Sequence, residues 1–341
     1  MGDSNAEAQA PVFKDRKTGL VLFGVLHIGL GGLCALMVPL MLFGLAMSKT
    51  ASSHAAQPLD TRTMVPGLAL YALLAIYFVW VGVGSILARR WARALILVGS
   101  WLWLICGVSG LAVMGLILPD MYEQMGASGQ MPKSLASVML VSTLAFMALL
   151  YVLWPGALVL FYGSKHVRGT CELRNPDPSW TDACPLPVLA LSLLFGFWAC
   201  SALFMSCYDW VTPFFGTLLS GPAGAFVVLC STSLLAYLSW GTLRLSVRAW
   251  TCAVGLVFAW ALSVGLTFSR HSLMDLYVKM QFPEEQLRLM KPLCEKHVPL
   301  MAAFCAVWFT VLLGYLLYVR RFFPRDLAAK NAESPMPKGQ P

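Results

Sequence analysis

The sequence predicts an all-α integral membrane protein with eight transmembrane helices, arranged as two parallel four-helix repeats. Three observations support this fold class. Only 12% of the 341 residues are charged, whereas a soluble chain carries about 25%. Apolar stretches long enough to cross a hydrocarbon layer of about 30 Å occur eight times. A passage rich in arginine and tryptophan occurs once in each half of the chain.

The eight predicted spans follow one another with short connections. Three cations, Lys14, Arg16 and Lys17, precede the first stretch as they would in a secretory signal. Its apolar run is about twice the length of a signal's, so we expect it to be retained as a span. The expected bounds are 17–47, 64–87, 94–118, 134–162, 186–210, 223–243, 249–268 and 299–319.

The positions of lysine and arginine predict the orientation of the chain. With a cytoplasmic N-terminus, 16 of the 24 basic residues fall on the cytoplasmic side, while the acidic residues divide equally between the two sides. Cytoplasmic loops are enriched in Lys and Arg, so both termini are expected inside. The basic residues lie at membrane boundaries and not along one soluble face, so we expect no nucleic-acid partner.

The repeated passage reads LARRWARALILVGSWLWL in the first half and SVRAWTCAVGLVFAWAL in the second. Aligning Trp91 with Trp250 also pairs Arg89 with Arg248. Positively charged and aromatic residues gather at the membrane boundaries of any multi-pass protein, which could explain this match alone. The interfacial anchors expected at these junctions are Arg89, Arg90, Trp91, Arg93, Arg248 and Trp250.

A second match follows downstream, where both halves contain Asp, an apolar residue, Tyr, two further residues and Met. It begins at Asp120 in the first half and at Asp275 in the second. Interfacial composition does not predict this match, so we predict an internal duplication. Two copies with an even number of spans enter the membrane in the same orientation. The expected parts are a first unit at 1–163, a cytoplasmic linker at 164–185, a second unit at 186–325 and a disordered tail at 326–341.

The sequence WVGVGS at 80–85, followed by RRWAR at 89–93, resembles a helix junction of uncharacterised bacterial multi-pass inner-membrane proteins. The resemblance is short, and it implies a bacterial inner membrane as the location. It supplies no functional residues, because no activity is assigned to that group. The second half departs from the pattern, since it keeps Trp240, Gly241 and Arg248 but has fewer arginines.

Few residues in the sequence point to a site. Asp120 with Tyr122, and Asp275 with Tyr277, are expected at the outer boundary of each half, where they could line a shared site. The alternative is that each Asp caps a helix and each Tyr anchors at the interface. His27 is the one histidine expected within a span, on a stripe of small residues that should face neighbouring helices. It could pack there or contact a ligand.

Two of the connections between spans contain features that predict structure or binding. The segment 163–187 is expected to be a structured linker or, in the sharper interpretation, the binding site of a protein partner. In the outer connection at 269–298, a proline at 283 followed by two acids predicts the start of an amphipathic helix on the outer leaflet. Cys207 and Cys294 could pair at the outer face. Cys171, Cys184 and His166 lack a fourth ligand, so we expect no metal and no cofactor.

Three functional classes stay open. The sequence favours a non-catalytic membrane component whose partners are membrane lipids and a protein at 163–187. The alternatives are a carrier for a neutral or lipid-like molecule between the two repeats, and a membrane-embedded enzyme acting on a lipid. Signatures of nucleotide binding, zinc hydrolysis and serine hydrolysis do not occur in the sequence.

Overall fold

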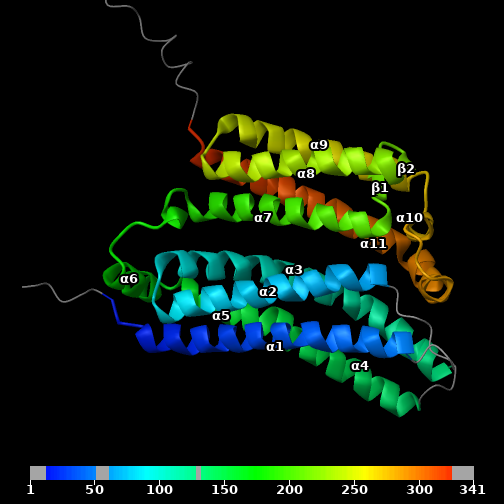
Figure 1. The fold of residues 1–341 in the computed structure, drawn as a ribbon, viewed down its shortest axis with the longest axis horizontal. Coiled ribbons are helices and arrows are strands. Elements are labelled where there is room, and N and C mark those ends of the chain that lie inside the picture. The colour runs from blue at the N-terminus through cyan, green and yellow to red at the C-terminus, as the bar shows by residue number, and fades with distance from the viewer. Residues whose placement is uncertain (1–12, 51–60, 128–131, 325–341) are drawn as a thin grey trace, which may run out of the picture. The chain divides into compact units, whose positions relative to one another are not determined.

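The computed structural model describes residues 13–50, 61–127 and 132–324, and these are almost entirely helical (Figure 1). The chain divides into two compact units, residues 1–182 and 183–341. The predicted tail at 326–341 lies outside the described residues. Within them, eight helices are long and apolar enough to cross a membrane. The chain therefore has the architecture of an all-α multi-pass membrane protein.

The eight spans expose large apolar side chains instead of burying them. Leu160 is 79% exposed, Phe226 70% and Ile76 67%. A soluble protein does not expose contiguous apolar surface on this scale, because water makes that unfavourable, whereas lipid solvates it well. The spans are Lys17–Met47, Met64–Ile86, Arg90–Glu123, Ser134–Gly163, Leu186–Tyr208, Gly221–Leu243, Val247–Phe268 and Cys294–Phe322.

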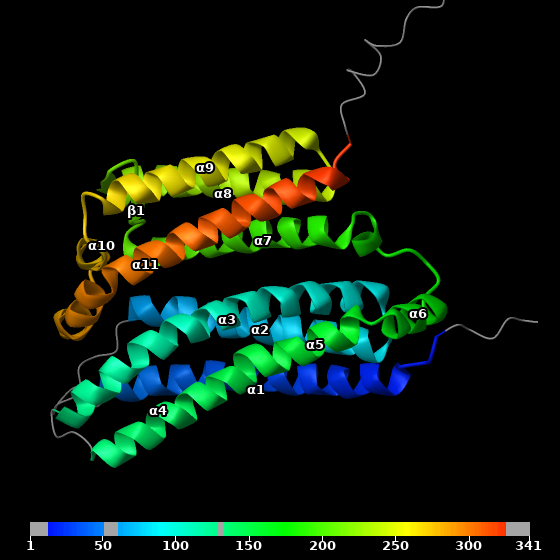
Figure 2. The ribbon, with the colours of Figure 1, turned by 180° about the vertical axis from the view of Figure 1, so that it is seen from behind.

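The first unit consists of four membrane-spanning segments and one short helix. Its helices are α1 (Lys17–Thr50), α2 (Thr61–Ile86), α3 (Arg90–Ala127), α4 (Lys133–Ala148), α5 (Trp154–Gly163) and α6 (Lys165–Arg174). A π-helical turn at Leu149–Leu153 joins α4 to α5, which together form the fourth span (Figure 2). Pro155 lies just after this turn and has no N–H to donate, which accounts for the local departure from α-helical geometry.

Close contact between α1 and α2 depends on two glycines. A Cβ added to Gly24 would lie 2.8 Å from the carbonyl oxygen of Gly82, and the reverse distance is also 2.8 Å. In lipid, small residues permit the close backbone packing that holds helices together. The stripe of small residues predicted around His27 comprises Gly24, Gly31 and Ala35. It is confirmed at Gly24, His27 and Gly31, which are buried, although Ala35 is exposed.

The second unit begins with α7 (Leu186–Ala202) and a 3-10 turn, Leu203–Tyr208. A small antiparallel hairpin follows, in which β1 (Thr212–Phe214) pairs with β2 (Thr217–Leu219) and Pro213 lies opposite Leu218. The remaining helices are α8 (Gly221–Leu243), α9 (Val247–Phe268), α10 (Leu273–Lys279) and α11 (Glu284–Val319). Helices α7 and α8 are joined by reciprocal hydrogen bonds, because each hydroxyl of Ser192 and Ser239 donates to the other residue's carbonyl, at 2.6 and 2.8 Å.

The outer connection of the second unit agrees with the prediction in part, because a helix does begin at Glu284, with Pro283 as its N-cap. The helix that begins at Glu284 is not a separate amphipathic helix, because α11 continues without a break to Val319 and forms the last span. Pro292 and Pro299 lie inside it. The short helix α10 precedes it. The predicted span boundary at 299 is therefore the middle of a longer helix.

Candidate functional site

A densely hydrogen-bonded surface at the ends of the spans of the first unit surrounds α6. It consists of Phe13–Lys17 at the start of α1, the turn between α2 and α3 with the first residues of α3 (Leu87–Arg93), and 165–182. We call these residues the α6 platform. All of them belong to the first unit. The expected linker at 164–185 thus contains a folded helix that the sequence analysis did not predict.

Helix α6 is stabilised by a hydrogen bond at its N-terminus, by an ion pair on its surface and by a small buried face. Ser164 is the N-cap, and its hydroxyl accepts a hydrogen bond from the N–H of His166 at 3.2 Å. Arg168 pairs with Glu172 one turn later, at 2.8 Å. Both interactions are typical of stable helix termini and helix surfaces. The buried face is small and consists of Val167, Thr170 and Cys171.

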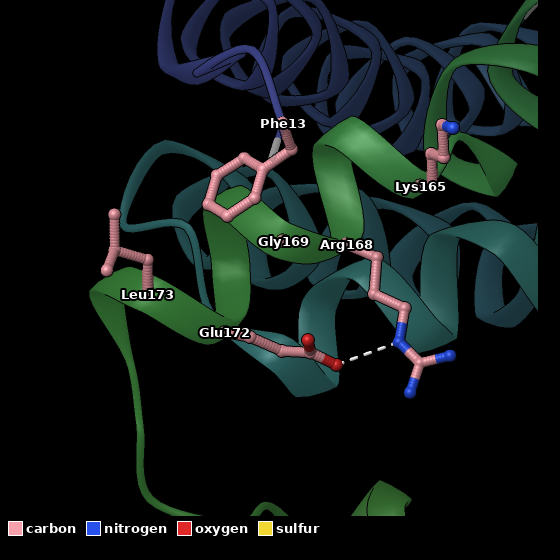
Figure 3. A pocket seen from close by; sticks show the side chains of 6 residues that line it. All are labelled: Phe13, Lys165, Arg168, Gly169, Glu172 and Leu173. Atoms are coloured by element: carbon pink, nitrogen blue, oxygen red, sulfur yellow. Dashed lines mark hydrogen bonds and ion pairs between the residues drawn. The ribbon is translucent and has the colours of Figure 1, made fainter. Parts of the chain in front are cut away.

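The segment before α1 docks along α6. The backbone N–H of Lys14 donates to Nδ1 of His166 at 3.2 Å, and that of Arg16 donates to the hydroxyl of Thr170 at 3.0 Å. Phe13 lies over Gly169, where an added Cβ would come within 2.7 Å of the phenyl ring (Figure 3). Residues more than 150 positions apart in the sequence therefore form one surface.

An ion pair fixes the end of this contact. Arg174 donates to Asp15 at 2.8 Å. This hydrogen bond, together with one from the N–H of Lys17, holds the pKa of the Asp15 carboxyl below its ordinary value of 3.8. The same reasoning applies within α6, where the hydrogen bond from Arg168 lowers the pKa of Glu172 below 4.5.

Asn175 joins the end of α6 to the turn between α2 and α3. Its side-chain amide donates to the carbonyls of Ala88 and Leu87, at 2.9 and 3.3 Å, and its amide oxygen accepts from Arg89 at 2.9 Å. These bonds satisfy carbonyls that the end of α2 leaves without helical partners. Ala88 has a positive φ of 52°, so this turn is held in a conformation that a non-glycine residue adopts only with support.

Arg90 is the centre of a small charge network. Its guanidinium lies 3.7 Å from Glu172 and 3.6 Å from Asp182. Asp182 also accepts from the N–H of Ser179 at 2.8 Å, which orders the short turn Trp180–Asp182. The network therefore connects α3, α6 and the segment after α6.

Arg93, one turn into α3, differs from these arginines. Its Nε is buried and has no hydrogen-bond partner within the part of the chain that the structure describes. Arg168, Glu172, Asp182 and the thiol of Cys171 all lie within electrostatic range of it. Burial raises the pKa of that thiol to about 11, against the opposing effect of Arg93 and Arg90.

An open groove of about 460 Å³ crosses the platform (Figure 3). Charged and apolar residues line it together: Phe13, Lys165, Arg168, Gly169, Glu172 and Leu173. A second hollow, of about 600 Å³, is wholly apolar and lies along α2, where it is lined by Ala75, Ile76, Val79, Trp80 and Val83. The first can recognise charge, whereas the second offers only apolar contact.

The residues predicted for an outer site have contacts within their own units. The hydroxyl of Tyr122 lies 3.2 Å from that of Thr143, which joins α3 to α4. Asp275 forms a capping box with Ser272 at the start of α10, and Tyr277 contacts Phe282 with ring centroids 5.3 Å apart. Asp120 lies in the body of α3, whereas Asp275 lies in the first turn of the separate helix α10, so their local settings differ. The shared outer site stays a prediction.

His27 is packed among aromatic rings. It is 2% exposed, and its Nδ1 lies 2.7 Å from the carbonyl oxygen of Phe23, one turn earlier in α1. The carbonyl accepts, so Nδ1 carries the proton in this arrangement. The rings of Phe78, Trp154 and Tyr162 surround it at centroid distances of 6.0 to 6.4 Å.

The expected interfacial anchors divide by unit. Arg89, Arg90 and Arg93 belong to the α6 platform. Trp91 stacks on Trp80 with centroids 4.6 Å apart. In the second unit, Arg248 is exposed and Trp250 donates to the carbonyl of Leu316 in α11 at 2.8 Å.

Sequence reasoning missed the polar residues that assemble the platform, namely Asp15, Thr170, Glu172 and Asn175. The N-cap at Ser164 and the Arg168–Glu172 spacing were signals that could have identified α6.

Cys207 and Cys294 are free thiols in the structure. Across 13–50, 61–127 and 132–324, no three His, Cys, Asp or Glu side chains gather as metal ligands would. No protein family, curated protein or solved structure that was compared with the chain matches it.

Proposed function

We propose that this protein is a non-catalytic component of a bacterial inner membrane that binds a protein partner through the α6 platform. One observation carries the proposal. Leu173 and Trp180 lie outside the spans and are 65% and 47% exposed. Large apolar side chains on a polar surface are typical anchors of protein interfaces, and tryptophan is enriched among residues that dominate binding energy.

The platform also holds these anchors in place before binding. Leu173 belongs to α6, whose neighbouring Arg174 is paired with Asp15. Trp180 begins the turn that Asp182 orders through Ser179 and Arg90. Binding then requires less ordering of the surface, which lowers its entropic cost.

Site-specific photo-crosslinking in native membranes tests this proposal. A photoreactive residue at position 173 and another at 180 should both form an adduct with the same protein. The matched control is position 160, because Leu160 is equally apolar but lies within a span and should capture lipid. Adducts that are identical at all three positions, or that contain only lipid at 173 and 180, would contradict the proposal.

We further propose that the platform and both termini are cytoplasmic. Lys14, Arg89, Arg90, Lys165 and Arg168 all belong to the platform, and positive residues concentrate on the cytoplasmic side of membrane proteins. A fluorescent protein fused after residue 341 should therefore fold and fluoresce, whereas alkaline phosphatase fused at that point should be inactive. The opposite pair of results would reverse the orientation.

We infer that the two units arose by duplication, and their local geometry supports this. In both units the first helix packs on the second, the second on the third and the third on the fourth span. Ala88 and Leu245 end the second helix of each unit with positive φ values of 52° and 56°. The N–H groups of these residues donate three positions back at 2.9 Å in both turns.

With these turns aligned, the proposed duplication has an offset of 157 residues, because α2 ends at Ile86 and α8 at Leu243. In this register Trp91 corresponds to Arg248, so the pairing of Trp91 with Trp250 in the sequence alignment is shifted by two residues. Buried positions also recur with one spacing in α1 and α7. They are Leu20, Gly24, His27 and Gly31 in the first and Val188, Ser192, Phe195 and Ala199 in the second.

The carrier and the lipid-modifying enzyme remain predictions from the sequence.

A further inference from the structure

Arg93 stands apart from the other arginines at the start of α3 and on α6. Its Nε is buried and has no acceptor in the described part of the chain. Its neighbours each donate to a protein oxygen: Arg89 to Asn175, Arg90 to Pro176, Arg168 to Glu172 and Arg174 to Asp15. A buried donor without an acceptor is unfavourable, so native structures nearly always supply one from protein, water or a ligand.

The carboxylates near Arg93 are already engaged. Glu172 accepts from Arg168 at 2.8 Å and lies 3.7 Å from Arg90. Asp182 lies 3.6 Å from Arg90 and accepts from the N–H of Ser179. Arg168 is itself within electrostatic range of Arg93, and like charges repel. The cations of this cluster therefore exceed its carboxylates, and Arg93 forms no direct ion pair with Glu172 or Asp182.

The cluster lies at the membrane boundary. Arg93 is in the first turn of α3, where the third span begins at Arg90, and Lys165 follows closely after the fourth span ends at Gly163. Lipid phosphates occupy this level of the bilayer. The groove beside Arg168 also presents Phe13 and Leu173 (Figure 3), which are apolar groups suited to the glycerol and upper acyl region of a lipid.

We propose that Arg93, together with Arg168 and Lys165, binds the phosphate of an anionic phospholipid. A guanidinium presents a planar set of N–H donors that matches phosphate oxygens, and such charge-assisted bonds are stronger than neutral ones. The phosphate supplies negative charge to a cluster in which cations outnumber carboxylates. Leu173 borders both this site and the protein-binding surface, and the two proposals differ in their ligand and in their test.

Native mass spectrometry of the full chain in a neutral detergent provides the test. The probes are phosphatidylglycerol, phosphatidylcholine and inorganic phosphate, each titrated into the wild-type protein, Arg93→Gln and Arg248→Gln. Arg248 is the matched control, because it is an exposed interfacial arginine in the first turn of α9 in the other unit. The wild type should retain phosphatidylglycerol in preference to phosphatidylcholine. Arg93→Gln should weaken this binding about tenfold or more, whereas Arg248→Gln should leave it unchanged.

Three results would overturn the proposal. Equal weakening by Arg93→Gln and Arg248→Gln would indicate a diffuse attraction between charges. Equal binding of inorganic phosphate at the same concentration would indicate an anion site and not a lipid site. Equal retention of phosphatidylglycerol and phosphatidylcholine would show that the net charge of the lipid does not determine binding.

If Arg93→Gln does not fold, Arg168→Gln decides the question, because that side chain is 65% exposed and its replacement disturbs no buried group. A loss of about tenfold supports the proposal, and unchanged affinity overturns it. The crosslinks at positions 173 and 180 do not depend on this result, so a failure of the lipid site and a failure of the proposed function are distinguishable.

Discussion

Gly84 packs against Ala92 so closely that a Cβ added to the glycine would lie 2.6 Å from the Cβ of the alanine. Gly241 has the same relationship to Ala249, also at 2.6 Å. Both alanines are 0% exposed. Each glycine is in the last turn of one span and each alanine in the first turn of the next. The two pairs therefore set how closely α2 approaches α3 and how closely α8 approaches α9.

Replacement of either glycine by alanine should therefore destabilise the protein. Real Cβ atoms do not approach to 2.6 Å, so α2 and α3, or α8 and α9, must separate. We expect Gly84→Ala and Gly241→Ala each to lower the free energy of unfolding by about 1–3 kcal/mol. Titration with sodium dodecyl sulfate in mixed micelles measures this.

Gly110→Ala and Gly265→Ala are the matched controls. Both glycines lie inside spans with nothing within 4 Å of an added Cβ. Alanine favours helix over glycine by up to about 1 kcal/mol, so these variants should be neutral or more stable. If Gly84→Ala is as stable as Gly110→Ala, close packing does not hold this junction together.

Asn175 should be the polar residue on which the first junction depends most. Its replacement by alanine removes two hydrogen bonds to the carbonyls of Leu87 and Ala88 and one from Arg89. We expect Asn175→Ala to cost about 1–2 kcal/mol of unfolding free energy. Hydrogen exchange of the turn amides should increase in the same variant.

Asp177→Ala is the control for Asn175→Ala. Asp177 is exposed and only two residues away, so its loss should change stability by less than about 0.5 kcal/mol. Similar effects of the two substitutions would show that the side-chain bonds of Asn175 do not support the turn.

The eight spans could be predicted from sequence because each depends on a local property, an apolar run long enough to cross the bilayer. Helix α6 could not be predicted by that criterion. Its sequence, KHVRGTCELR, is polar and contains a glycine and a threonine, and the Asn-Pro-Asp-Pro that follows favours a turn. The helix is stabilised by contacts with the segment before α1, in which Asp15 pairs with Arg174 and the N–H of Arg16 donates to Thr170. These contacts form only after the chain folds.

The proposed duplication illustrates a different limit. In the proposed register, tryptophan and arginine recur at both junctions but do not occupy equivalent positions, and the membrane interface favours both residue types. Trp91 stacks on Trp80, whereas Trp250 donates a hydrogen bond to α11. Small residues and turn geometry define the register better, since Gly84 and Gly241 must be small for a steric reason. Helix α10 had a recognisable signal in its capping box, Ser272 with Asp275.

Docking of the N-terminal segment on α6 should weaken at acid pH. The pKa of Asp15 is lower in the folded chain than its ordinary value of 3.8, because it accepts from Arg174 and Lys17. A carboxyl with a lowered pKa stabilises the folded contact above its ordinary pKa, and this contribution is lost as the pH falls below 3.8. Amide exchange of residues 13–17, corrected for its intrinsic pH dependence, should therefore increase in that range.

Asp15→Asn separates this effect from general acid unfolding. Without the carboxyl, residues 13–17 should exchange faster already at pH 7 and should show little further change as the pH falls. An Asp15→Asn variant with the same acid response as the wild type would assign the response to another group, such as Glu172, whose pKa is also lowered.

Cys171 should be unreactive while the platform is folded. Burial raises the pKa of its thiol to about 11 from an ordinary value of 9.0, and only the thiolate reacts with maleimides. At pH 8 about one Cys171 in a thousand is then ionised. The raised pKa means that the folded chain favours the neutral thiol. The contribution of Cys171 to the free energy of unfolding is therefore present below pH 9.0 and is lost as the pH rises toward 11.

Peptide mapping after treatment with N-ethylmaleimide at pH 8 checks this. We expect Cys171 to be unmodified in the folded protein and modified in the denatured chain. A cysteine placed at the exposed position 177 of the same platform gives the reference rate. If Cys171 reacts as fast as that reference, α6 must leave α3 often enough to expose its buried face, and the platform would not present Leu173 and Trp180 as a rigid surface.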